Sequence, residues 1–140
     1  MSSPLDPVSQ AQEAINSLSN TYLDWTRSQI RDMFNLIELY EDGQKSFSAA
    51  VLEQIYDLSH NVKGMGSSFG YHLMTDVGGN LCSYLQKLDQ PKEACFKVIN
   101  AHIKAMDLII NDDIGGSGGH AGQKLLGQLQ NMVEESLSGD

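Results

Sequence analysis

The sequence predicts an all-α protein, because apolar residues recur at helical spacing along most of its 140 residues without the period-2 alternation of a half-buried strand. Short turn-forming segments separate the periodic stretches. An antiparallel up-and-down four-helix bundle within residues 20–113 is therefore the expected architecture, with additional short N-terminal and C-terminal helices. A chain of this length most simply forms one domain, residues 1–140.

The first two helices of the expected bundle follow from two apolar stripes separated by an Asp-Gly turn. Residues 1–7 are expected to be disordered, and residues 8–18 to form a short helix of their own. The first long helix is predicted over residues 23–40. Ser46 or Ser48 can cap the second helix. The apolar face of the second helix is expected to comprise Leu52, Ile55, Ser59 and Val62.

Two more helices and a C-terminal extension complete the predicted fold. Gly78-Gly79 weakens the third helix, and Pro91 suits the first turn of the fourth, where its missing N–H costs nothing. Residues 114–140 comprise a Gly-rich linker, flexible by composition, and an extra helix from about residue 121 to about residue 137. The strongest apolar stripe lies in the fourth helix, at Phe96, Ile99, Ile103, Met106 and Ile110.

Composition excludes several classes of function. The chain has 18 acidic and 9 basic residues and a net charge of −9, so nucleic acid, which is bound largely through Lys and Arg, is not an expected partner. There is no signal-peptide pattern at the N-terminus and no run approaching ~18 apolar residues. Cys82 and Cys95 have no metal or redox spacing and are expected to be reduced and buried. A cytoplasmic protein without membrane association is expected.

The segment LSHNVKGMGSSFG, residues 58–70, places glycines in a predicted helix, although each costs about 1 kcal/mol relative to alanine. At ~100° per residue, Tyr56, His60, Lys63, Gly64 and Ser67 share one stripe to the side of the apolar face. His60 is therefore expected at the surface, with Lys63 one turn away. Gly64, also one turn away, would leave the flank of the imidazole open.

An accessible imidazole beside a lysine suits a covalent relay. Histidine is a nucleophile, and phosphorylation of its ring would place oxyanions where Lys63 can donate a charge-assisted hydrogen bond. The sequence contains no nucleotide-binding motif and no acidic residues spaced as metal ligands. The groups that transfer the phosphoryl group would therefore come from a partner protein.

The segment His60-Asn61-Val62-Lys63-Gly64, followed by Gly66, Ser67, Phe69 and Gly70, resembles the phosphorylation motif of histidine phosphotransfer (HPt) domains. That motif reads His-x-x-Lys-Gly, then small residues, an apolar residue and a glycine. The family forms an up-and-down four-helix bundle that carries a phosphoryl group between a kinase or its receiver and the aspartate of another receiver domain. This chain departs from the pattern at Met65 and Gly66, and in the extra C-terminal helix.

The resemblance implies a role for each residue of the stripe. His60 would accept the phosphoryl group, Lys63 would stabilise it, and Gly64, Ser67 and Tyr56 would border the partner's access. The expected partners are response-regulator receiver domains and a hybrid histidine kinase. No cofactor or independent kinase activity is expected, and Mg²⁺ would be bound only by the partner receiver domain.

A different class of function is a non-enzymatic helical adaptor that binds a partner through an apolar helix face. The extra C-terminal helix offers such a face in Leu125, Leu129, Met132 and Val133. The other histidines carry less weight for either function: His72 follows the motif, His102 flanks the apolar stripe of the fourth helix, and His120 lies in the linker.

Overall fold

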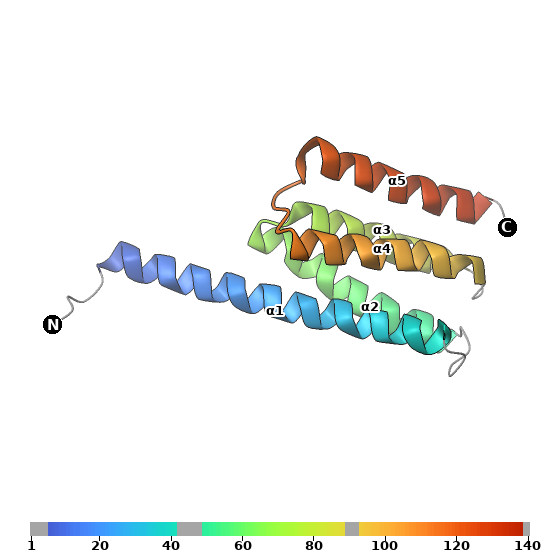
Figure 1. The fold of residues 1–140 in the computed structure, drawn as a ribbon, viewed down its shortest axis with the longest axis horizontal. Helices are drawn as coiled ribbons and strands as arrows, with labels where there is room; N and C mark the ends of the chain where they lie inside the picture. Colours follow the sequence, from blue (N-terminus) through green and yellow to red (C-terminus); the bar gives the residue numbers. More distant parts are fainter. Residues whose placement is uncertain (1–5, 42–48, 89–92, 139–140) are drawn as a thin grey trace.

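The computed structural model describes residues 6–41, 49–88 and 93–138. Within these ranges the chain is helical and has no β-strand, which confirms the predicted all-α class. Successive helices run in alternating directions (Figure 1). Ser46, Ser48, Pro91 and residues 1–5, for which the sequence made predictions, fall outside the described ranges. The elements are α1 (Pro7–Glu41), α2 (Ala49–Gly66), the 3₁₀ turn η1 (Ser67–Phe69), α3 (His72–Lys87), α4 (Glu93–Asn111) and α5 (Gly119–Ser138).

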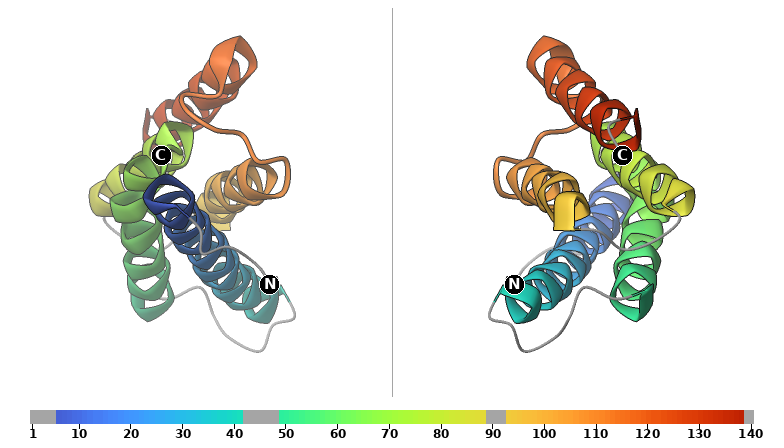
Figure 2. Two further views of the ribbon diagram at one scale, coloured as in Figure 1. Left: turned by 90° about the vertical axis from the view of Figure 1, so that its left-hand side faces the viewer. Right: turned by 90° about the vertical axis from the view of Figure 1, so that its right-hand side faces the viewer.

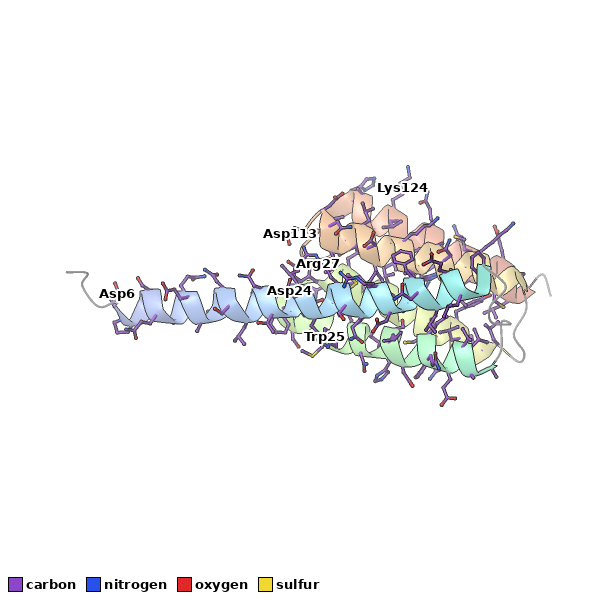
Figure 3. All side chains as sticks on the ribbon, turned by 60° about the horizontal axis from the view of Figure 1, so that its bottom comes forward. Asp6, Asp24, Trp25, Arg27, Asp113 and Lys124 are labelled. Atoms are coloured by element: carbon purple, nitrogen blue, oxygen red, sulfur yellow. The ribbon has the colours of Figure 1, made fainter. Side chains whose placement is uncertain are left out.

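Helix α1 is one continuous helix of 35 residues, so the predicted separate helix over residues 8–18 is wrong. The helix begins at Pro7 because Asp6 caps it, accepting a hydrogen bond from the Ser9 backbone N–H at 2.7 Å. Residues 19–22 are weak helix formers but include no glycine or proline. The helix therefore continues through them, and its N-terminal part projects beyond the other helices (Figure 3).

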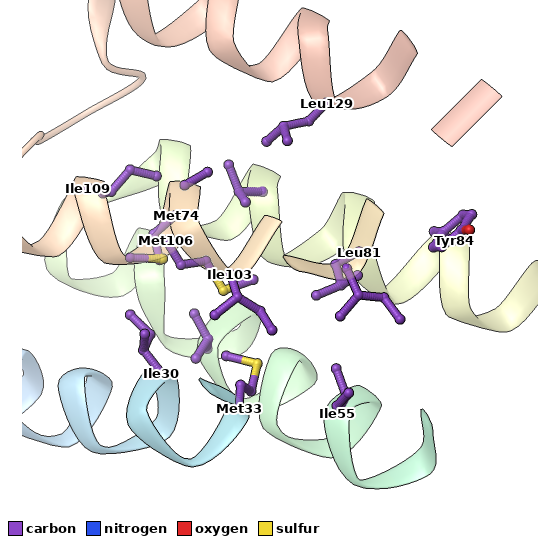
Figure 4. Close-up of a cluster of buried hydrophobic side chains, with 14 of the residues drawn as sticks. Ile30, Met33, Ile55, Met74, Leu81, Tyr84, Ile103, Met106, Ile109 and Leu129 are labelled. Atoms are coloured by element: carbon purple, nitrogen blue, oxygen red, sulfur yellow. The ribbon is translucent and has the colours of Figure 1, made fainter. Parts of the chain in front are cut away.

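The core lies between the helices and uses the predicted apolar stripes. Helix α2 packs mainly against α3, α1 contacts α2 and α4, and α3 contacts α4. Helix α5 lies against α3 and α4, away from α1 (Figure 2). No helix in the described ranges is long and apolar enough to span a membrane. Fully buried side chains in this core include Met33, Ile55, Met74, Leu81, Tyr84, Ile103, Met106 and Ile109 (Figure 4). Ile99 is fully buried as well.

The Gly-rich segment before α5 is hydrogen-bonded to the start of α3 and is not an open linker. The Gly116 N–H donates to the Gly70 carbonyl at 2.6 Å, and the Leu73 N–H donates to the Gly116 carbonyl at 2.8 Å. Gly118 has φ +80°, and a Cβ there would lie 2.7 Å from Cδ2 of Leu73. Close packing of this segment fixes where α5 begins.

Helix α5 adds to the core. Leu126, Leu129 and Val133 are buried on the face toward α3 and α4. Near the end of α5, the Ser136 hydroxyl hydrogen-bonds the hydroxyl of Tyr84 on α3 at 2.6 Å. The apolar face of α5 is thus covered within the chain itself.

The buried histidine and cysteines are part of this core. His102 hydrogen-bonds the Val98 carbonyl through Nδ1 at 2.7 Å and Asn80 Nδ2 through Nε2 at 2.8 Å. Because the carbonyl requires Nδ1–H as donor, Nε2 accepts from the amide and the ring is neutral. Burial lowers the pKa of His102 from its ordinary value, which also favours the neutral ring. Cys82 and Cys95 are free and buried, as predicted.

Replacing Leu129 tests whether α5 is part of the folded unit. Leu129 is 3% exposed, so Leu129→Ala should lower the free energy of unfolding by about 2–5 kcal/mol, through lost burial and an added cavity. Leu137 on the same helix is 36% exposed, and Leu137→Ala should change stability by no more than about 0.5 kcal/mol. Urea unfolding measures both. Equal small effects would show that α5 is not part of the cooperative core.

Candidate functional site

His60 lies exposed on α2, on the side that helical periodicity predicts. Its imidazole stacks against the ring of Tyr56, one turn earlier, with centroids 5.9 Å apart. The Tyr56 hydroxyl in turn accepts a hydrogen bond from Nε2 of Gln86 on α3 at 2.9 Å. Helix α3 thus holds the tyrosine that orients the imidazole, while the imidazole remains open to solvent.

Lys63, one turn after His60, is also exposed, but its aliphatic stem lies along α3. A Cβ added at Gly79 would be 3.6 Å from Cε and 3.7 Å from Cδ of this lysine. Among the residues that the structure describes, no carboxylate pairs with the Lys63 ammonium. The charge is therefore available to an anionic group that arrives at this surface, and a rotation of the flexible stem can bring it there.

Glycines of α3 allow the close contact with α2 beneath this lysine. A Cβ added at Gly78 would lie 3.2 Å from both the backbone N and the Cα of Lys63. The buried Ser59 hydroxyl donates to the Gly78 carbonyl at 3.2 Å. Sequence reasoning treated Gly78-Gly79 only as a weakness of α3. Paired small residues in an amphipathic helix were the available signal for close helix packing.

The three glycines of the motif differ in whether the fold requires them. A Cβ at Gly66 would lie 2.5 Å from Thr75 Oγ1 and 2.9 Å from the Tyr71 carbonyl oxygen, so this glycine is required by packing. Gly70 ends η1 in the left-handed conformation, with φ +86°. Gly64 has an unexceptional φ, and a Cβ there would meet no atom within 4 Å. Only Gly64 therefore lacks a structural reason inside the chain.

Thr75 fastens the end of α2 to α3, and sequence reasoning missed it. Its hydroxyl donates to the Lys63 carbonyl at 3.0 Å and accepts from the Ser67 backbone N–H at 2.8 Å. Ser67 was predicted on the exposed stripe; it is exposed, but it lies in η1 and not in α2. No local pattern signals Thr75, because its role depends on the register between the two helices.

Two grooves flank α2. A polar groove of about 460 Å³ includes Lys63 and runs between α3 and α5, with walls from Asp76, Asn80 and Gln130. A groove of about 370 Å³ between α1 and α2 is mainly apolar. Its lining includes Leu36, Leu39 and Leu58, with Asp32 and Asp57 as the acidic residues. Lys63 lines the first groove, whereas His60 lines neither.

No protein-family model, curated protein or solved structure matches the chain. The functional argument therefore comes from the residues of the site and their geometry. Within the described ranges, no three His, Cys, Asp or Glu side chains gather as potential metal ligands.

Replacing either Gly64 or Gly66 by alanine tests which of the two glycines the packing of the fold requires. Gly64→Ala should stabilise the fold by up to about 1 kcal/mol, because alanine favours helix and its methyl group meets only open space. Gly66→Ala, two residues later, should destabilise it by about 1–3 kcal/mol, because the methyl group would overlap Thr75 and the Tyr71 carbonyl. Urea unfolding of both variants measures whether each substitution raises or lowers the free energy of unfolding. Destabilisation by Gly64→Ala would mean that Gly64 is needed for folding.

Proposed function

We propose that this chain is a phosphorelay intermediate: helices α1 to α4 form an antiparallel up-and-down four-helix bundle, and His60 on α2 accepts and donates a phosphoryl group. The observation that carries the proposal is the combination at one exposed surface of His60, the available charge of Lys63 and the open space at Gly64. The His-x-x-Lys-Gly resemblance to histidine phosphotransfer domains supports the same assignment. The exchange would take place in the cytoplasm, with receiver domains and a hybrid histidine kinase as partners.

The proposed reaction moves one phosphoryl group between two proteins. A ring nitrogen of neutral His60 attacks the phosphorus of a receiver's aspartyl phosphate, the new P–N bond forms, and the P–O bond to the aspartate breaks. The carboxylate leaves with the electron pair of that bond. In the reverse direction a receiver aspartate attacks phosphohistidine, and the ring nitrogen leaves. Mg²⁺ bound by the receiver would neutralise the transferring oxygens.

Each neighbour of His60 contributes to this reaction through position or charge. Stacking by Tyr56 limits rotation of the imidazole, so less rotational freedom is lost when the partner docks. The Lys63 ammonium can move from the surface of α3 to a phosphoryl oxygen on His60 and form a charge-assisted hydrogen bond. Gly64 leaves the approach free for a receiver, whose aspartate must come within about 3–3.5 Å of the phosphorus.

The alternative function, a helical adaptor, would need the apolar face of α5 to be free for a partner. The apolar side chains of α5 that would recruit a partner helix are covered: Leu129 and Val133 are buried, and Leu125 and Met132 are partly buried against the core. A partner could reach them only if α5 left α3 and α4. The relay function requires no such rearrangement, because His60 is already exposed.

Replacement of His60 tests the phosphoaccepting site directly. His60→Gln should abolish acid-labile, base-stable phosphate after incubation with a phosphorylated receiver domain, because the nucleophilic nitrogen is gone. His72 and His120 are the other exposed histidines, so His72→Gln and His120→Gln are matched controls that should label like the wild type. Circular dichroism should show the same helicity for all four proteins. Labelling of His60→Gln at the wild-type level would rule out the assignment.

A leucine at Gly64 tests whether this glycine clears the way for a protein. Gly64→Leu should slow transfer between His60 and a receiver by about a hundredfold, because the side chain would hold the two reacting atoms apart. Phosphorylation by phosphoramidate, a small donor, should be nearly unchanged. A Cβ added at Gly127 on α5 would likewise meet no atom within 4 Å, which makes Gly127→Leu the matched control.

The ratio of the two phosphorylation rates decides the role of Gly64. Equal losses with the receiver and with phosphoramidate would show that Gly64 protects the surroundings of the imidazole. No loss with the receiver would show that the partner does not approach over this residue.

A further inference from the structure

The N-terminal arm of α1, residues 7–21, extends past the ends of the other helices (Figures 1 and 3). Every residue from Gln10 to Leu18 is exposed. Three of the large apolar side chains that the structure leaves exposed lie in this arm: Val8 at 78%, Ile15 at 56% and Leu18 at 59%. The arm therefore presents apolar surface that its own chain does not cover.

The exposed apolar residues of the arm follow a heptad pattern. Val8, Ala11, Ile15 and Leu18 are separated by three, four and three residues, the spacing of a coiled-coil seam. The spacing continues through Tyr22 and Trp25, where the helix enters the body and Tyr22 stacks on Phe69 at 4.6 Å. The seam thus begins in the open arm and runs into a buried part of the same helix. A seam of this kind fits another helix.

The polar groups of the arm either lie opposite the seam or flank it with hydrogen-bond partners inside the same helix. Gln12 Nε2 donates to Asn16 Oδ1 at 3.1 Å, and the Thr21 hydroxyl donates to the Ser17 carbonyl at 2.9 Å. The only charged residue between positions 7 and 23 is Glu13, which falls at the heptad position opposite the seam. Packing along the seam would therefore bury no charge, and Gln12 and Thr21 at its edges would keep hydrogen-bond partners within their own helix.

Charge selects a second copy of this chain as the partner. The arm is nearly neutral in a protein of net charge −9, so two arms can meet without the repulsion that would oppose contact between other faces. A symmetric dimer needs a patch that complements itself, and an uncharged apolar seam meets that requirement. The arm contains no Lys or Arg, which an amphipathic helix uses to bind an anionic membrane surface.

We propose that two copies of the protein pair through their α1 arms as an antiparallel two-helix contact. In this arrangement Val8 of one copy lies against Leu18 of the other, and the 15 residues of each arm, about 22 Å of helix, overlap along their length. The acidic bodies then lie at opposite ends of the pair. A parallel arrangement would place both bodies side by side and bring their negative charges together.

Sedimentation of the full-length chain tests the dimer from about 1 µM to about 500 µM. The wild type should approach twice the 15.4 kDa mass of one chain as concentration rises. The double substitution Ile15→Glu and Leu18→Glu, which places charge in the seam, should remain monomeric. Ser17→Glu adds a charge on the other face of the same turn and should dimerise like the wild type. Cooperative urea unfolding of the body should be retained in every variant.

Four outcomes would overturn the proposal. A wild type that stays monomeric at every concentration has no arm-to-arm contact, and dimerisation of the double variant would move the interface to another surface. Co-sedimentation of a monomeric wild type with phosphatidylcholine vesicles would assign the arm to a lipid surface. Small-angle scattering of the dimer should show two separated bodies, and a single compact body would exclude the antiparallel arrangement.

Discussion

The close contact of α2 with α3 is the constraint on which the candidate site depends. Gly78 brings the α3 backbone so near to Lys63 that even a methyl group would meet the α2 backbone at 3.2 Å. At this separation the Ser59 hydroxyl reaches the Gly78 carbonyl and the Thr75 hydroxyl reaches the Lys63 carbonyl. The same approach lets α3 support Tyr56 and the stem of Lys63. The surface around His60 is thus built on two locked helices, which hold side chains more exactly in place than a loop would.

The glycines around the site lower helix propensity, and the structure shows what offsets that cost. At Gly66 and Gly78 the gain is close packing between helices, which a side chain would prevent. Gly64 has no such compensation, because the space beside it is empty. A residue that weakens its own helix and packs against nothing is the kind expected where another molecule must approach. Gly127 on α5 is equally open, so the support for the proposed docking surface is that the open Gly64 lies one turn from the exposed His60 and beside Lys63.

Sequence reasoning predicted what depends on periodicity within one helix. It placed Ile55, Ser59 and Val62 on the buried face of α2 and His60 on the exposed side. It divided α1 in two between residues 18 and 23, although neither glycine nor proline stops the helix there. The roles of Thr75 and Gly79 could not be predicted, since they depend on which residues of α3 face Lys63. The relay function and its partners remain predictions of the motif.

The Gly-rich segment before α5 is hydrogen-bonded to the rest of the fold, and this makes α5 an integral part of the domain. Gly/Ser-rich stretches commonly mark boundaries at which domains are joined or exchanged. Here Gly116, Gly118 and Gly119 all have positive φ, and the backbone of Gly116 is hydrogen-bonded to both Gly70 and Leu73. Splicing another module into this segment would disrupt the start of α3 and the turn that follows the His60 helix. Recombination should therefore transmit α5 together with the other four helices as a single inherited unit.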